Sequence, residues 1–198
     1  MQADIATTVV WIAWVVSWWA AAFWSARAVK RPSPASQVLY RVVTIAGFIL
    51  LFRYFPQGRS TWMLWTLGIP VRWVMVTVVA AGLSFTWWAR VHLGRLWSGS
   101  ITRKADHHIV DTGPYGIVRH PIYTGIIIAE IATAIQSGAV QAFVGAALMI
   151  VGFYIKARME EGFLRTQVDA AAYDAYSHRV PMLIPFMRVA LWVFLCGL

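Results

Sequence analysis

The stretch HHIVDTGPYGIVRHPIYTG, residues 107–125, is the part of the sequence on which the interpretation of the fold depends. It brings three of the five histidines, two tyrosines and an arginine to the start of an apolar segment, in a chain that is 60% hydrophobic. Polar and titratable groups cost free energy when they leave water for apolar surroundings, unless a partner compensates them. We therefore expect this stretch to hold a polar, charged cofactor at a membrane surface.

The composition is that of an integral membrane protein. Charged residues make up 13% of the 198 residues, against about a quarter in a typical soluble domain, and the mean hydropathy is +0.63. The first apolar run, residues 5–26, has no basic cluster before it and no small-residue cleavage site after it, so we expect a retained span rather than a signal peptide. The single Cys196 excludes an internal disulfide.

Apolar runs predict an all-α protein with about five transmembrane helices. A crossing needs about 20 apolar residues, and runs at residues 5–26, 41–53 and 73–89 are the first three candidates. The run at 121–155 is too long for one crossing and is interrupted at 136–138, so it predicts a hairpin of two spans. The apolar segments 60–70 and 189–198 are short, and we expect them to lie at the interface.

The remaining segments are polar. Residues 90–120 form a long connector, which we expect to cap a cofactor, and an amphipathic helix is expected after Lys156, ended by Pro181 and Pro185. The sequence thus divides into N-terminal spans, residues 1–89, and a catalytic region, residues 90–198.

The distribution of basic residues predicts the orientation. The net charge of +9 could indicate nucleic-acid binding, but the charges lie between apolar runs, as the positive-inside rule describes. With the N-terminus outside, the inner connectors carry 14 of the 17 Lys and Arg residues, and the outer side keeps only Arg53, Arg59 and Arg72. We therefore expect the C-terminus and the polar stretch on the cytoplasmic side, and no nucleic-acid partner.

Two groups of functional residues are expected to meet at that inner surface. Pro121 suits the first turn of a helix, and His120, Tyr123 and Thr124 would then share one face. Lys156 and Glu160 are one turn apart on the following span. Because a hairpin joins the two spans, both groups return to the same face of the membrane.

These motifs occur together in a known family. The chain has a His-x-hydrophobic-Val strip at 107–110, Gly-x-Tyr at 113–115, Arg-His-Pro-x-Tyr-x-Gly at 119–125, Glu-Glu at 160–161, then Arg-Val-Pro at 179–181 and Pro185. Over residues 90–186 this order resembles the isoprenylcysteine carboxyl methyltransferase family of membrane proteins. The Arg-His-Pro-x-Tyr part alone is also similar to phospholipid methyltransferases and sterol reductases.

The resemblance implies an S-adenosylmethionine-dependent membrane methyltransferase without a Rossmann domain. Carried over to this chain, the cofactor-binding residues would be His107, Ile109, Val110, Tyr115, His120, Pro121, Tyr123 and Glu160. The family's arginine one turn before the first glutamate falls on Lys156 here, so either Lys156 or Arg158 would contact the acceptor as the catalytic cation.

The sequence leaves the acceptor open. A carboxylate, as on an isoprenylcysteine-like lipid, needs no base because its pKa is near 3.5. An amine or thiol, as in phospholipid N-methylation or thiol S-methylation, would need one, and Glu161 or His108 would be the candidates. The expected partners are membrane lipids and a lipidic or small apolar acceptor, with no obligate protein partner.

Two other classes of function remain as alternatives. One is an NADPH-dependent membrane reductase similar to sterol reductases, which have more spans before the motif than this chain supplies. The other is a non-enzymatic scaffold or small transporter, which leaves the His, Tyr and Glu residues unexplained. No metal site is expected, because no Cys or helical His pair supports one, and the mid-span Glu130 is either functional or a helix-packing group.

Overall fold

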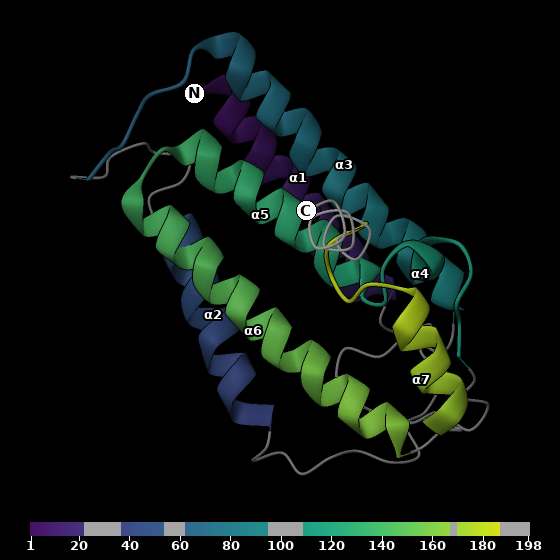
Figure 1. Cartoon of the computed structure of the whole chain (residues 1–198). Coiled ribbons are helices and arrows are strands. Elements are labelled where there is room, and N and C mark those ends of the chain that lie inside the picture. The colour runs from purple at the N-terminus through teal and green to yellow at the C-terminus, as the bar shows by residue number, and fades with distance from the viewer. Residues whose placement is uncertain (22–36, 54–61, 95–108, 167–169, 187–198) are drawn as a thin grey trace, which may run out of the picture.

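A computed structural model describes residues 1–21, 37–53, 62–94, 109–166 and 170–186. The named elements in these ranges are all helices (Figure 1). They are α1 (Gln2–Ala21), α2 (Val38–Phe52), α3 (Ile69–Leu93), α4 (Pro114–Ile117), α5 (Pro121–Ser137), α6 (Val140–Arg165) and α7 (Ala170–Arg179). The expectation of an all-α protein is therefore confirmed for the described residues.

Three of these helices are long and apolar enough to cross a membrane. They are α1, α3 and α6, with 20, 25 and 26 residues. The shorter α2, with 15 residues, is also apolar, and α5 has 17. Both fall below the roughly 20 residues of an untilted crossing. The chain is an integral membrane protein by this measure, and the number of five spans stays a prediction.

The long helices pack in two groups that meet along the α5–α6 hairpin. Helix α3 packs on α1 and α5, while α2 packs on α6, and the hairpin turn lies at the opposite end of the bundle from α7 (Figure 1). One apolar core joins the groups, with Trp11, Leu51, Leu83, Ala129 and Met149 as members from all five helices. The expected packing role of the α1 tryptophans is confirmed at Trp11.

Glycines allow the closest helix contacts. A Cβ placed on Gly125 of α5 would lie 2.5 Å from the carbonyl oxygen of Gly82 on α3, and one on Gly47 of α2 would lie 2.6 Å from that of Gly145 on α6. Such distances are shorter than any normal contact. Small residues let membrane helices approach closely where apolar burial gives little drive for association, so these pairs fix α3 against α5 and α2 against α6.

The α5–α6 turn is held by the segment that precedes α3. Gly138 has a positive φ of 68° and ends α5, and its carbonyl accepts the Leu64 amide at 2.8 Å. The Val140 amide donates to the Trp62 carbonyl at 3.0 Å, while the Trp65 indole donates to the Ile135 carbonyl at 3.0 Å. Residues 62–68 are not helical, so this apolar segment lies across the hairpin turn and does not cross the membrane as a helix.

Helices α3 and α6 extend beyond the apolar runs that predicted them. Helix α3 continues to Leu93 because Arg90, fully buried, donates to the carbonyls of Gly94 and Ala21 at 2.8 and 2.9 Å. Helix α6 continues through the charged residues after Lys156 to Arg165, and α7 follows as a separate helix. The turn expected at 55–58 and the segment 189–198 lie outside the described residues.

Candidate functional site

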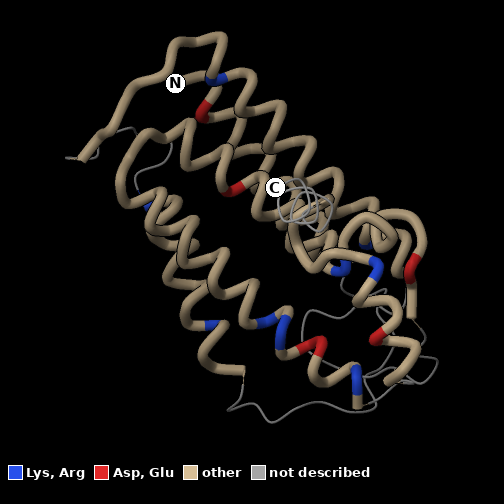
Figure 2. Tube along the Cα trace, viewed as in Figure 1, with Lys and Arg blue, Asp and Glu red and all other residues tan. Residues whose placement is uncertain are grey.

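The site lies where the start of α5 meets the end of α6. The hairpin places these two ends at the same end of the bundle, next to α4 and α7 (Figure 1). Charged residues gather there along the last turns of α6 and around α7, whereas few lie in the middle of the bundle (Figure 2). The local sequence explains the start of α5, since Pro121 occupies its first turn and has no amide donor to satisfy.

Tyr123 and Glu160 are in direct contact. The Tyr123 hydroxyl donates to the Glu160 carboxylate, at 2.8 Å from each oxygen. The Tyr123 ring lies between two others, stacked on His120 with centroids 5.4 Å apart and on Phe153 of α6 with centroids 5.2 Å apart. Because Tyr123 is buried, the carboxylate is held at the end of an aromatic wall.

Lys156 belongs to this wall and Arg158 does not. The Lys156 ammonium lies 5.1 Å from the centre of the Tyr123 ring and 5.7 Å from that of Tyr40 on α2, both within the range of a cation–π contact. Arg158 is exposed, because residues two apart on a helix face different sides. The structure therefore places one of the two expected catalytic cations beside Tyr123.

A second carboxylate, Glu161, joins the start of α5 to α6 through two bases. Its Oε1 accepts from Arg119 Nε at 2.7 Å and contacts His120 Nε2 at 3.2 Å. His120 Nδ1 also lies 3.6 Å from Glu160. These side chains are largely buried, with Arg119 only 9% and Glu161 only 10% exposed, so His120 is held between the two neighbouring glutamates.

Arg119 also holds the end of α7. Its guanidinium donates to the carbonyls of Ser177 and Val180 at 2.9 and 2.6 Å, and its amide donates to the Pro181 carbonyl at 2.9 Å. Carbonyls at the end of a helix have no partner within the helix, and a cation satisfies them well. One arginine thus connects α5, α6 and α7.

The other expected residues lie around α4. Ile109 packs on Tyr173, Tyr176 and Val180. Val110 is half-buried, and Tyr115 is buried and stacks on His92. Burial raises the pKa of the Tyr176 hydroxyl, which stays protonated and donates to the Tyr115 carbonyl at 2.9 Å.

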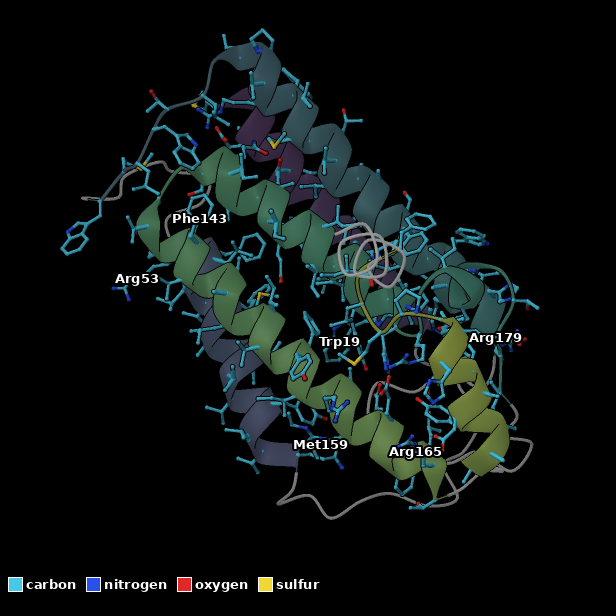
Figure 3. The ribbon with its side chains drawn as sticks, viewed as in Figure 1. Trp19, Arg53, Phe143, Met159, Arg165 and Arg179 are labelled. Atoms are coloured by element: carbon cyan, nitrogen blue, oxygen red, sulfur yellow. The ribbon has the colours of Figure 1, made fainter. Side chains whose placement is uncertain are left out.

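Exposed ion pairs surround this cluster. Arg165 pairs with Asp174 and Arg179 with Asp111, and Figure 3 labels both arginines beside α7. His107 lies outside the described residues.

The site also contains residues that the sequence alone did not assign to it. Arg119 and Glu161 adjoin expected residues, so their place in the motifs was a usable signal. Phe153 and Tyr40 gave none, because aromatic residues in apolar spans are common and only packing brings these two to Tyr123 or Lys156. No group of three or more His, Cys, Asp or Glu able to hold a metal occurs among the residues that the structure describes.

Comparisons with known proteins agree with this geometry. The model of the isoprenylcysteine carboxyl methyltransferase family matches residues 73–166, which include the start of α5 and the end of α6. The chain is 26% identical over 156 residues to protein-S-isoprenylcysteine O-methyltransferase B of Arabidopsis thaliana, covering 76% of this chain and 74% of that protein. It is 25% identical over 139 residues to a probable protein-S-isoprenylcysteine O-methyltransferase of Oryza sativa subsp. indica, covering 68% of each.

Proposed function

Because this chain belongs to the isoprenylcysteine carboxyl methyltransferase family and is a membrane methyltransferase, we propose that it methylates the carboxylate of a lipid-like acceptor and uses S-adenosylmethionine as donor. The acceptor would be isoprenylcysteine-like or another lipid that reaches the site through the membrane. The observation that carries the proposal is the contact between Tyr123 and Glu160, with Lys156 on the same aromatic wall.

The described residues fit this donor chemically. S-adenosylmethionine has a sulfonium, an ammonium, a carboxylate, hydroxyls and an adenine, and it supplies an electrophilic methyl group when bound. The Lys156 ammonium between two tyrosine rings shows that a cation is stable against this wall. Glu160 offers a carboxylate for an ammonium or for hydroxyls. The residues that would hold the donor are those named from the sequence, His107, Ile109, Val110, Tyr115, His120, Pro121, Tyr123 and Glu160.

Lys156 is the residue proposed to hold the acceptor. It lies on the same face of α6 as Glu160, one turn nearer the middle of the helix, so an acceptor arriving from the membrane would reach Lys156 first. An ammonium there would neutralise a carboxylate and point one of its oxygens toward the donor. Positioning and exclusion of water would then provide most of the rate enhancement.

A carboxylate acceptor fits the site better than an amine or a thiol. A carboxylate is ionised at neutral pH and needs no base, whereas an amine or thiol must lose a proton. Glu161, one expected base, is already paired with Arg119 and His120. His108, the other, lies outside the described residues.

We further propose that this end of the bundle faces the cytoplasm, as the distribution of Lys and Arg predicts. The end of α6 and the whole of α7 would then lie at or beneath the inner leaflet.

Two assays test the proposed function. Purified protein in detergent, titrated with S-adenosylmethionine, S-adenosylhomocysteine and NADPH, should release or absorb heat with the first two and not with NADPH. Methyl transfer from labelled donor should then be measured to prenylcysteine, phospholipid and thiol acceptors, with the carboxylate acceptor preferred. Heat with NADPH alone, or transfer to the amine or thiol only, would contradict the proposal.

A further inference from the structure

Glu130 is a buried carboxylic acid in the middle of α5, the helix that begins the site. Its side chain is fully buried, and neither carboxyl oxygen has a hydrogen-bond partner in the described part of the chain. A polar group that leaves water without a partner costs free energy. Ionisable residues at this depth of a membrane protein generally mark a pathway or a binding site.

Asp4, another buried acid of the same chain, has the partners that a purely structural carboxylate needs. It is 2% exposed, and it accepts from Arg72 and, at 3.1 Å, from the Gln136 amide. The amine of Met1 lies 3.0 Å from its other oxygen. Asp4 is therefore fully paired, whereas Glu130 is not, although both lie inside the same bundle.

The position of Glu130 connects it to the site. It follows Tyr123 by seven residues, which is about two helical turns and about 10 Å along α5, so the two side chains share one face of the helix. The opposite face packs on α3, since a Cβ on Gly82 would lie 2.7 Å from the Gly125 carbonyl oxygen and 3.2 Å from the Ala129 amide nitrogen. Glu130 therefore faces the seam between α5 and α6, as Tyr123 does through Phe153.

We propose that Glu130 binds a hydrogen-bond donor, a hydroxyl or an amine, within the lipid part of the methyl acceptor. The inference rests on the proposed function and narrows its substrate class. A carboxyl group can accept a hydrogen bond in either protonation state, so a donor on the acceptor satisfies Glu130 in both. The acceptor is then an amphiphile with a carboxylate beside Lys156 and a hydroxyl or amine about 10 Å deeper along α5, not a plain hydrocarbon chain.

A matched set of acceptors tests this inference. N-acetyl-S-farnesylcysteine is compared with analogues that carry one hydroxyl at successive positions of the chain, using labelled S-adenosylmethionine. One hydroxyl position should raise kcat/KM of the wild-type enzyme over the plain acceptor by about tenfold, the effect of one good hydrogen bond. Glu130→Leu should remove this preference, while Glu130→Gln, whose amide oxygen still accepts, should keep part of it.

A second measurement separates binding from a structural role. Without acceptor, Glu130→Leu should raise the thermal midpoint of the protein in detergent, because it removes an unpaired buried carboxyl. A lower midpoint together with an unchanged preference would show that Glu130 stabilises the bundle and would overturn the inference.

The two proposals fail in different ways. If the wild-type enzyme methylates the plain acceptor and shows no preference for any hydroxylated analogue, the inference is wrong and the proposed function stands. If it methylates no carboxylate in the set, the proposed function itself is wrong.

Discussion

Lys156 is the residue that distinguishes acceptor binding from donor binding in this site. Its ammonium lies over the rings of Tyr123 and Tyr40, whereas the donor residues surround Glu160. A cation needs little rearrangement to exchange an aromatic face for an incoming carboxylate, because a charged hydrogen bond is stronger than a cation–π contact at a solvated site.

Substitution of Lys156 should separate the two ligands. In Lys156→Ala, kcat/KM for the carboxylate acceptor should fall by about tenfold to a hundredfold, the range expected for a lost charged hydrogen bond, with the dissociation constant of S-adenosylmethionine changed by less than about threefold. Lys156→Arg should recover part of the activity. Steady-state kinetics and calorimetric titration measure these quantities.

Arg158→Ala is the matched control, because Arg158 is on the same helix and exposed. An equal loss in Arg158→Ala and Lys156→Ala would show that the acceptor is held from the other side of α6.

Sequence reasoning identified Lys156, Tyr123 and Glu160 because each occupies a defined place in a motif. It could not identify Tyr40 or Phe153, since their role depends on how α2 and α6 pack, and no local pattern encodes that packing. It also left Lys156 and Arg158 undecided, and the choice became possible once α6 proved to continue as one helix to Arg165.

The contact between α3 and α5 depends on glycine at the level of the element. A methyl group on Gly125 would lie 2.5 Å from the Gly82 carbonyl oxygen and 2.6 Å from Thr86. Gly125→Ala should therefore push the two helices apart and lower the thermal midpoint by several degrees, since overpacking costs about 1–3 kcal/mol.

Gly162→Ala adds the same methyl group where nothing lies within 4 Å. It should leave the midpoint unchanged or raise it, because alanine favours the helix. Equal midpoints for Gly125→Ala and Gly162→Ala would mean that α3 and α5 do not pack as described.

Helix α7 is held mainly through Arg119. In Arg119→Met, the carbonyls of Ser177 and Val180 and the carboxylate of Glu161 lose their donor. Breaking a buried ion pair costs about 3–5 kcal/mol, so hydrogen exchange of the α7 amides should become much faster.

The control is Arg179→Met, which removes only the exposed pair with Asp111. Exposed pairs contribute about 0–1 kcal/mol, and α7 exchange should hardly change. Faster exchange in Arg179→Met than in Arg119→Met would show that α7 is held from its outer side.

The helical hairpin was predictable, because residues 121–155 exceed one crossing and contain a glycine turn. The end of α3 was not. The charge of Arg90 suggested that the helix stops there, whereas its buried guanidinium binds the carbonyls of Ala21 and Gly94, and that partner on α1 is distant in sequence.

For the whole molecule, the bundle should have its α7 end in the cytoplasm. In a Cys196→Ser background, Arg165→Cys marks the end of α6 and Trp62→Cys marks the hairpin turn, and both positions are exposed. A membrane-impermeant thiol reagent added to intact cells should label Trp62→Cys alone. Labelling of Arg165→Cys alone would reverse the orientation.

The most direct measurement of the central claim is a double-mutant cycle on the affinity for S-adenosylmethionine, with Tyr123→Phe, Glu160→Ala and the double variant. Tyr123 and Glu160 share a hydrogen bond, so two groups holding one molecule should act as a unit. We predict tight binding to the wild type, a loss of about tenfold or more in each single variant, and little further loss in the double variant. Unchanged affinity in both single variants would contradict the claim that the start of α5 and the end of α6 form one donor site.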